Sequence, residues 1–475
     1  MSTKRKILIW VLVLVLLLIF AAAWIVQGDA ADLAVEEVAG TDPTLSEPES
    51  ELIPTVRIAQ PVGWGDNEAP RAAEGLAVTR FATGLDHPRV IHTLPNGDVL
   101  VTLTRAPAAK GDGGGITDWI AGLLMSRAGA TGESPDQLVL LRDDLSSPSG
   151  IAWHDGTLYV ANHDAVLAFD YEEGATAITG NPRKLMDLPA AGNHWMRNIV
   201  LNEDGTRLYV AVGSASNYGE MGMEAEEGRA AIHELNLESG ESRIFGTGLR
   251  NPNGLAWNPW SGELWTTVNE RDMLGSDLVP DYLTNVPVGV TYGWPWLYWG
   301  ENIDARVERE VSPMPNFLTE YSRTPEYALG PHVAALGLAF TRQGSTMGDA
   351  FGRGAFIARH GSWNRKPPAG YDVVFVRFDE RGNPQGKPVK VLGSFLAGNG
   401  QTHGRPTWVA WDKTGALLVS DDTANIIWRV TSPGARPAGE QVRIRGASMP
   451  PQRELTSDPR RAFEEVPEGM TPGSL

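Results

Sequence analysis

Short apolar segments alternate with polar turns along most of the chain. Stretches such as "GLAWNPWSGELWTTVN" and "TWVAWDKTGALLVSD" place runs rich in β-branched and aromatic residues on either side of a turn that contains Gly, Asn or Asp. This pattern is typical of β-hairpins. Because helical periodicity is scarce in the rest of the sequence, the pattern predicts an all-β fold.

The hairpin pattern recurs six times at intervals of roughly 50 to 80 residues, from "GLDHPRVIHTLPNGDVLVT" to "GRPTWVAWDKTGALLVSDD". Radial repetition of sheets with about four short strands each produces such a sequence. We therefore predict a six-bladed β-propeller over residues 75–431. A pair of β-sandwiches would also supply many strands, but it would not explain why "GIAW" and "GLAW" recur at matching positions of their repeats.

The first 30 residues have a different pattern, in which Lys4, Arg5 and Lys6 precede an apolar run over residues 7–26. About 20 apolar residues can span a bilayer, and a basic flank stays on the cytoplasmic side. We predict that residues 1–27 form an uncleaved signal anchor, with a cleaved signal peptide as the alternative. The folded domain is then expected in the periplasm or an equivalent extracytoplasmic space, anchored to the cytoplasmic membrane.

The segments on either side of the predicted propeller lack apolar periodicity. Residues 28–74 are acidic and rich in Pro, Ala and Glu, which predicts a tether with little structure. Residues 432–475 are similarly poor in apolar periodicity and predict a low-structure tail.

Composition excludes several classes of function. The net charge of -18 argues against nucleic-acid binding, because the phosphate backbone would be repelled. The chain contains 0 Cys, so disulfides, thiolate nucleophiles and zinc-thiolate or iron-sulfur sites are impossible. Small neutral or polar substrates remain open.

The turns that lead into the innermost strands of a propeller converge on one face, so residues at the same phase of different repeats meet there. Several cations occupy this phase, and a ligand with several carboxylates would satisfy them bidentately. The alternative is that each arginine forms an ion pair with an acidic residue at the rim. The polar residues at this phase are Asp86, His87 and Arg89, then Asn193, His194 and Arg197, then Arg250 and Asn251, and finally His403 and Arg405.

Two further features suggest chemistry. His194 is a candidate general base for a substrate hydroxyl, because imidazole titrates near neutral pH; the alternative is a surface or structural histidine. The stretch "VNERDMLGSDLVPDY" brings Glu270, Asp272, Asp277 and Asp281 close together. Such oxygen ligands suit calcium, although a solvated acidic loop would have the same composition.

Two loops rich in aromatic residues, "YGWPW" and "HGSWNRKPPAGYDV", could stack over a flat ligand or a sugar, or could be ordinary loop packing. Taken together, "GLRNPNGLAWNP", "NERD" followed by "YGWP", and "HWMRNIV" resemble the soluble pyrroloquinoline quinone (PQQ)-dependent sugar dehydrogenases, nearest to the sorbosone and aldose sugar dehydrogenase branch. The resemblance covers residues 75–431.

The resemblance implies a six-bladed propeller with PQQ and Ca²⁺ as cofactors. It implies oxidation of an aldose, or of a sorbosone-like aldehyde, by hydride transfer to the quinone. An electron acceptor, a quinone or a cytochrome in or near the membrane, would then reoxidise the cofactor.

The resemblance also assigns roles to residues. It makes His194 the general base and Arg250 the group that polarises the quinone carbonyl. Calcium would be held by the backbone carbonyls of Asp272 and Met273, with Glu270 and Asp277 shaping the loop. The remaining cofactor contacts would be made by Asn193, Arg197, Asn251, Arg365 (with His360 as the alternative), His403 and Arg405.

This sequence departs from the family pattern at three positions. Asp272 and Met273 replace a glycine and a proline, Asn193 replaces the aspartate that often precedes the catalytic histidine, and His403 replaces an arginine. Two other classes of function stay open. A calcium-dependent, lactonase-like hydrolase would not need the arginines to converge, and a non-catalytic binding propeller tethered to the envelope would not need His194.

Overall fold

The computed structural model describes residues 28–432 apart from 52–53, 106–136, 139–142 and 317, together with six isolated residues between positions 3 and 15. Most of the predicted signal anchor at residues 1–27 lies outside the described residues, as do residues 433–475 of the predicted tail. Within the described part of the chain, no helix is both long and apolar enough to cross a bilayer.

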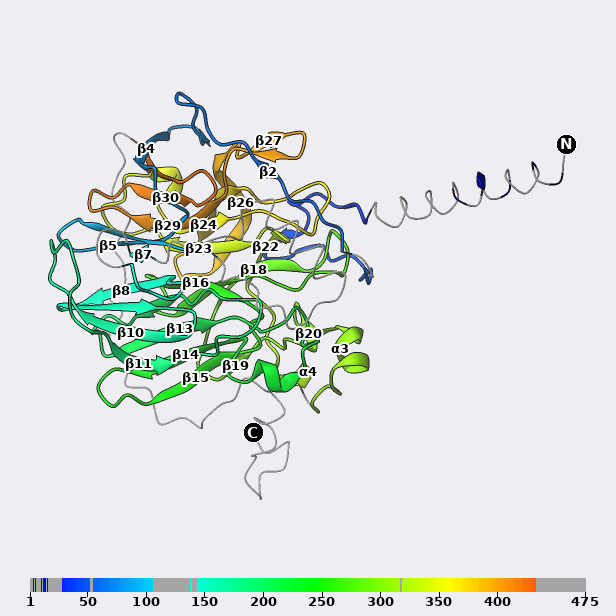
Figure 1. Ribbon diagram of the computed structural model, residues 1–475, viewed down its shortest axis with the longest axis horizontal. Helices are drawn as coiled ribbons and strands as arrows, with labels where there is room; N and C mark the ends of the chain where they lie inside the picture. Colours follow the sequence, from blue (N-terminus) through cyan, green and yellow to red (C-terminus); the bar gives the residue numbers. More distant parts are fainter. Residues whose placement is uncertain are drawn as a thin grey trace, which may run out of the picture.

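Six large sheets of mostly antiparallel strands make up the body of the molecule (Figure 1). The first contains β5 (Pro88–Thr93), β6 (Val99–Leu103) and β7 (Gln137–Leu138). The second contains β8 (Gly150–His154), β9 (Thr157–Ala161), β10 (Ala165–Asp170) and β11 (Arg183–Asp187). The third contains β12 (Ile199–Leu201), β13 (Arg207–Val212), β14 (Ala231–Asn236), β15 (Ser242–Thr247) and, parallel to β15, β19 (Val290–Thr291).

The other three large sheets each include a strand from the N-terminal part of the chain. The fourth contains β16 (Pro252–Trp257), β17 (Leu264–Val268), β18 (Pro280–Asn285), β22 (Tyr327–Pro331) and β1 (Ala39–Gly40). The fifth contains β23 (Ala335–Phe340), β24 (Gly354–Arg359), β25 (Asp372–Phe378), β26 (Pro384–Gly393) and β3 (Arg71–Ala72). The sixth contains β29 (Pro406–Trp411), β30 (Leu417–Asp421), β31 (Ile426–Thr431) and β4 (Ala77–Thr83).

The remaining elements are small. One sheet joins β2 (Gln60–Pro61), β28 (Gln401–Thr402) and β27 (Leu396–Gly398), and another joins β20 (Leu297–Tyr298) and β21 (Asn302–Ile303). The helices of the described residues from 28 onwards are α3 (Ala305–Glu310), α4 (Leu318–Tyr321) and the short 3-10 helices η1 (Met223–Glu226) and η2 (Asp349–Phe351).

The first strands of the six large sheets form a closed cycle. β5 contacts β8, β8 contacts β12, β12 contacts β16, β16 contacts β23, β23 contacts β29, and β29 returns to β5. Because the first strands run into antiparallel partners, the turn before each first strand and the loop after each second strand emerge at the same end of their sheet. The all-β architecture is therefore consistent with the predicted propeller fold, and it brings residues far apart in sequence to one end of the cycle.

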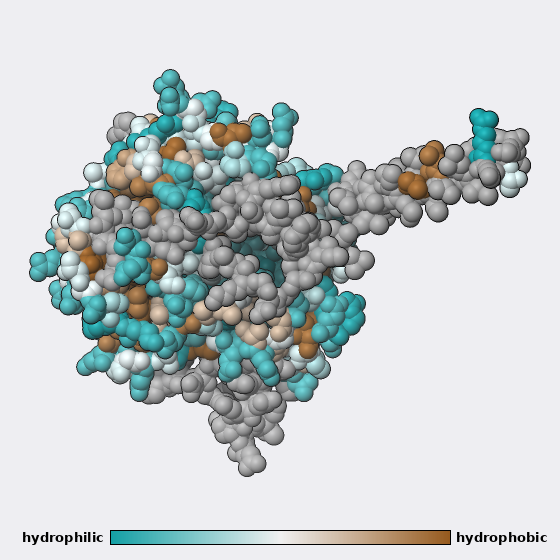
Figure 2. All heavy atoms as spheres, viewed as in Figure 1, coloured by the Kyte–Doolittle hydropathy of each residue, from teal (hydrophilic) through white to brown (hydrophobic). Residues whose placement is uncertain are grey.

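Six buried apolar clusters fill the spaces between successive sheets. The cluster between the sixth and first sheets, for example, packs Leu418 and Ile427 against Ile91 and Val101. Successive side chains of an inner strand point to opposite faces of its sheet, and each face packs against a neighbouring sheet. Both faces of an inner strand are therefore apolar. On the face shown in Figure 2, hydrophilic residues predominate and hydrophobic ones are scattered, so the apolar side chains are used mainly between the sheets.

Residues 28–62, which we call the N-terminal strap, pack along the sheets instead of forming the expected tether with little structure. β1 pairs with β22, and β2 pairs with β28. Asp277 accepts hydrogen bonds from the backbone N–H groups of Asp32 (2.6 Å) and Leu33 (2.9 Å), and Arg57 N–H donates to the carbonyl of Trp363 (2.7 Å). In Figure 1 these residues run, in blue, along the side of the molecule that carries β22 and β27. Tertiary hydrogen bonds thus order a segment whose composition lacks a core of its own.

Asp277 therefore anchors the strap, and its replacement should loosen it. One carboxylate oxygen accepts the two strap N–H groups, and the other accepts Arg365 at 3.0 Å. Asn can offer only one acceptor oxygen, so Asp277→Asn leaves either the strap or the buried Arg365 unsatisfied, at a cost of about 3 kcal/mol. We expect a melting temperature several degrees lower and faster proteolysis within residues 28–51. Asp170→Asn, at an exposed strand end, is the control, and equal melting temperatures for both variants would contradict the anchor role.

Candidate functional site

A cavity of about 270 Å³ lies at the end of the cycle where the turns before first strands meet the loops after second strands. Of the sequence-predicted site residues, six line this cavity: His194, Arg250, Asn251, Glu270, Asp272 and Arg405. The structure therefore brings together residues from three separate repeats, as the phase argument predicted. The cavity is also lined by His87 and Arg89, at the predicted phase of the first repeat, by Asp281 of the acidic stretch, and by Asn269, His332, His360 and Asp422.

The other predicted residues lie away from the cavity wall. Asn193 is exposed, and its described contact is a backbone hydrogen bond to Ala215. His403 donates from Nδ1 to the carbonyl of Gly63 at 2.7 Å and stacks on Trp64 with ring centroids 4.7 Å apart. Both side chains are thus placed at the periphery of the site and do not line the cavity.

Two predicted arginines have internal partners. Arg197 is fully buried and donates to the backbone carbonyls of His194 (2.7 Å) and Pro189 (2.7 Å). Arg365 is 2% exposed, pairs with Asp277 and donates to the carbonyl of Leu33 at 2.9 Å. In this structure Arg197 supports the turn that carries His194, and Arg365 fixes the strap, so neither guanidinium reaches the cavity.

His194 is oriented by Ser214, in the loop after β13. Its Nδ1 lies 2.9 Å from the carbonyl oxygen of Ser214 and 3.0 Å from the Ser214 hydroxyl, which itself donates to the carbonyl of Ser216 at 2.6 Å. Both Ser214 oxygens are therefore acceptors, so Nδ1 carries the proton and Nε2 is the unprotonated nitrogen of the neutral ring. No described residue hydrogen-bonds Nε2. This leaves a proton-accepting atom available at the cavity.

The protonation state of His194 follows from its surroundings. Burial, together with the positive charge of Arg250, lowers the pKa of His194 to about 3, against the opposing effect of the Ser214 carbonyl. His194 is thus neutral at physiological pH. Gly213 allows this crowding, because a Cβ at that position would lie 2.3 Å from Asn251 Oδ1 and 2.6 Å from His194 Cβ.

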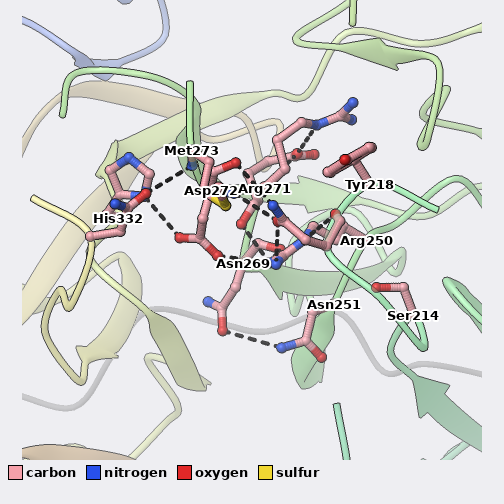
Figure 3. Close-up of polar contacts among 12 residues, drawn as sticks. Ser214, Tyr218, Arg250, Asn251, Asn269, Arg271, Asp272, Met273 and His332 are labelled. Carbon is pink, nitrogen blue, oxygen red and sulfur yellow. Dashed lines mark hydrogen bonds and ion pairs between the residues drawn. The ribbon is translucent and has the colours of Figure 1, made fainter. Parts of the chain in front are cut away.

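Arg250 is a charged residue just before the apolar strand β16, and its contacts explain why it is there. Its guanidinium clamps the loop after β17, donating to the carbonyl of Glu270 at 2.5 Å and pairing with Asp272 at 3.1 Å (Figure 3). It also donates to the carbonyl of Asn217 at 2.9 Å and to its side-chain oxygen at 2.8 Å. The side chain is buried and lines the cavity, so Arg250 both shapes the loop and presents positive charge to a ligand.

Asp272 receives two cationic partners on its two oxygens. Oδ2 accepts from Arg250, and Oδ1 lies 3.2 Å from His332 Nδ1, whose Nε2 donates to the carbonyl of Gly275 at 3.0 Å (Figure 3). Burial opposes ionisation, but the contacts with His332 and Arg250 outweigh it and hold the pKa of Asp272 below its usual value. For His332, burial favours the neutral ring, yet the Asp272 contact raises its pKa overall. Both shifts favour the ionised form of the pair.

Asp422 is another buried carboxylate at the cavity. Asp422 pairs with Arg89, lies 2.9 Å from His360 Nε2 and lies 3.6 Å from His87 Nε2. Although burial raises the pKa of Asp422, its contacts with His360, His87 and Arg89 hold it well below the usual value. This carboxylate is ionised and neutralises Arg89.

Arg405 is the cation of the cavity that is left without an acidic partner among the described residues. Its guanidinium donates to the backbone carbonyls of His360 (3.0 Å) and Gly361 (2.6 Å) and lies over the ring of Tyr371. The wall also includes two large aromatic side chains, Trp195 and Trp363. A planar anion suits this donor set, because its charge would pair with Arg405 and its ring could stack on a tryptophan.

Sequence reasoning missed His332 and Asp422, and it named His360 only as the alternative to Arg365. His332 precedes β23, whose repeat has the weakest hairpin pattern of the six. His360 and Asp422 follow the second strands β24 and β30, at the phase that Glu270 and Asp272 occupy after β17. The polar residues that follow the second strand of each repeat are the signal that identifies His360 and Asp422, whereas His332 lies before a first strand.

At the predicted calcium loop, the side chain of Arg306 contacts the expected metal ligands. Among the described residues, no group of three or more His, Asp or Glu side chains is arranged to hold a metal ion. The carbonyl oxygens of Asp272 and Met273, the predicted ligands, both accept hydrogen bonds from Nη1 of Arg306, at 3.2 and 3.1 Å. The side chain of Glu270 accepts from Arg271 at 3.1 Å, and Asp277 anchors the strap.

Comparison with known families supports a specific class. Residues 70–286 and 316–433 match the model of the family described as TrAA12-like. This match spans more than half of the chain. The chain therefore belongs to the TrAA12-like family, and the resemblance to the soluble PQQ-dependent sugar dehydrogenases is confirmed.

Similar proteins carry names of the same kind. The aldose sugar dehydrogenase YliI of Escherichia coli K12 is 28% identical over 46% of this chain and 61% of its own length. The PQQ-dependent pyranose dehydrogenase of Coprinopsis cinerea is 25% identical over 77% of this chain and 55% of its own length. Each match thus spans less than two thirds of the relative.

Solved structures share the fold. The calcium structure of a Trichoderma reesei enzyme of carbohydrate-active family AA12 has a TM-score of 0.60 at 20% identity and covers 77% of this chain and 97% of its own. The holo form of the PQQ domain of the Coprinopsis cinerea pyranose dehydrogenase has a TM-score of 0.59 at 21% identity, with 79% and 100% covered. At these identities the likeness establishes the architecture.

The low basicity of His194 can be measured directly. In the cofactor-free, full-length chain with ¹³C-labelled histidine, the ring signal that disappears in His194→Gln should remain in its neutral position from pH 8 down to pH 5, because burial and Arg250 favour the neutral ring. An ordinary histidine changes charge near about pH 6.5. A midpoint at or above that value would contradict the buried, Arg250-facing environment.

Proposed function

We propose that this protein is a PQQ-dependent dehydrogenase that oxidises the C1 hydroxyl of an aldose, or the hydrate of a sorbosone-like aldehyde. The observation that carries the proposal is the neutral His194, whose Nδ1 is fixed by Ser214 and whose Nε2 is available beside a cavity with an unpaired arginine. A proton acceptor next to an anion site is what alcohol oxidation by an anionic cofactor requires. Family membership and the names of the relatives support the same class.

The residues at the cavity fit PQQ, which is planar and carries three carboxylates. Arg405 would bind a carboxylate, since its guanidinium has no acidic partner among the described residues. Asn251 and Asn269, joined by a 3.4 Å contact, offer amide groups for the polar edge of the ring system, and Trp195 or Trp363 offers a stacking surface. When bound, PQQ would supply the two-electron acceptor to which the hydride of the sugar carbon passes.

His194 would take the hydroxyl proton of the substrate as the C–H bond at the same carbon breaks. The neutral ring accepts the proton on Nε2, while the carbonyl of Ser214 stabilises the resulting imidazolium through Nδ1. Oxidation of an aldose at C1 in this way gives the lactone, with one proton on His194 and two electrons with the hydride. Arg250, held by Asp272 and the Glu270 carbonyl, would keep positive charge beside the reacting groups.

Several parts of the proposal rest on sequence patterns. We interpret the six large sheets as the six blades of a propeller, in agreement with the cyclic contacts of their first strands. The apolar N-terminal run supports a periplasmic, membrane-anchored location, from which electrons would pass to a quinone or cytochrome in or near the membrane. Calcium remains part of the family expectation, but the carbonyls of Asp272 and Met273 do not fit it while Arg306 donates to both.

PQQ titration of the full-length chain in detergent tests the proposal. Binding is followed by quenching of tryptophan fluorescence, and turnover by dye reduction with a panel of aldoses. Arg405→Gln should weaken PQQ binding about 10- to 100-fold, because a charge-assisted pair is lost. His194→Gln should bind PQQ normally and lose turnover by about 10²- to 10⁴-fold.

Arg381→Gln, at an exposed hairpin turn, is the matched control and should behave as the wild type. Saturable PQQ binding without turnover for any sugar, unaffected by His194→Gln, would favour the binding propeller. Lactone hydrolysis without PQQ binding would favour the hydrolase.

A further inference from the structure

The loop after β17 carries the two carbonyl oxygens at which the family resemblance implies calcium, and an arginine of this chain already contacts both. Nη1 of Arg306 lies 3.2 Å from the Asp272 oxygen and 3.1 Å from the Met273 oxygen. One nitrogen of Arg306 therefore contacts both of the carbonyl oxygens that the resemblance assigns to calcium.

Each of these carbonyls also has a second donor. Asn217 Nδ2 donates to the Asp272 oxygen at 3.0 Å, and the backbone N–H of Glu51, in the strap, donates to the Met273 oxygen at 3.2 Å. A carbonyl oxygen has two lone pairs, so both acceptors are fully used. A metal ion could bind here only by displacing at least one donor from each oxygen.

Arg306 is held rigidly in this position. Its Nε and Nη2 pair with the two oxygens of Asp304 at 2.9 and 2.8 Å, and its guanidinium lies over the ring of Tyr218 at 4.5 Å. Asp304 also caps α3 by accepting from the backbone N–H of Arg306, and it pairs with the buried Arg271 at 3.3 Å. The side chain of Arg306 is 8% exposed. A bidentate, stacked arginine is fixed by geometry that lysine cannot reproduce.

We propose that the guanidinium of Arg306 takes the place of calcium at the carbonyls of Asp272 and Met273, so that this chain carries a built-in cation at this loop and does not bind calcium there. The guanidinium supplies positive charge to both carbonyls, and Asp304, which also pairs with Arg271, holds it in place. The inference concerns the protein without cofactor and stands apart from the proposed oxidation.

Removing the guanidinium should convert the loop into a calcium site. In Arg306→Ala, the two carbonyls each lose a donor, and Asp304 loses its bidentate partner. Two carbonyl oxygens and a carboxylate are the ligands that calcium prefers. Arg306→Lys keeps a positive charge near these oxygens, and Arg309→Ala removes an exposed arginine from the same helix as the matched control.

Calcium and terbium binding to the full-length, cofactor-free chain tests this. We expect Arg306→Ala to bind one ion at least ten times more tightly than the wild type, and Arg306→Lys and Arg309→Ala to resemble the wild type. One-to-one binding by the wild type as tight as that of Arg306→Ala would overturn the proposal. Absence of binding in every variant would overturn the claim that Arg306 is what excludes the ion.

A second measurement keeps the test valid if Arg306→Ala fails to fold. The melting temperature of the wild type should be equal in millimolar calcium and in chelator, because an ion that binds the folded state would raise it. A rise of several degrees with calcium but not with magnesium would overturn the proposal. Failure of the proposed function would instead appear as absent PQQ binding, which neither measurement uses.

Discussion

The ion pair between Arg250 and Asp272 is the interaction on which the arrangement of the site depends. It joins the turn before β16 to the loop after β17, and through Asp272 it extends to His332 before β23. The main chain of Asp272 contacts Asn217 and Arg306, so five segments meet at one residue. Breaking a buried pair of this kind typically costs about 3–5 kcal/mol, because the remaining charge is left in a medium that cannot solvate it. The same contacts of Asp272 therefore fix the positions of these segments and neutralise the buried charges of Arg250 and Asp272.

Charge balance around the cavity explains which cation is left for a ligand. Asp272 is matched by Arg250 and His332, and Asp422 by Arg89, whereas the guanidinium of Arg405 donates to backbone carbonyls and has no acidic partner among the described residues. An acidic protein thus keeps a locally cationic site by pairing its other buried charges internally. Asp281 adds less negative charge than an ordinary aspartate, because burial raises its pKa to about 7. Its two oxygens accept hydrogen bonds from the backbone N–H groups of Glu270 and Ala334.

Much of the fold could be predicted from the sequence because hairpins are local. The turn signals and the repeated "GLAW" pattern indicated the sheets and the phase at which His194, Arg250, Asn251 and Arg405 meet. Contacts of the strap could not be predicted, since they depend on single hydrogen bonds, such as those of Asp277, to residues more than 200 positions away. For the same reason Arg197, Arg365 and His403 were assigned to a ligand although carbonyls and a carboxylate within the chain already occupy them. A sequence shows that a cation is present but not which acceptor reaches it first.

The pairing of β4 with β31 has a consequence for the synthesis of the chain. Thr83 opposes Ile426, so the sixth sheet cannot form until nearly the whole domain has left the ribosome. At about 5–20 residues per second, this delay is on the order of tens of seconds. During that time Ile91 and Val101 of the first sheet lack Leu418 and Ile427, the residues that later cover them. The first sheet therefore keeps an exposed apolar face during synthesis, and the cycle can close only after the C-terminal strands have been made.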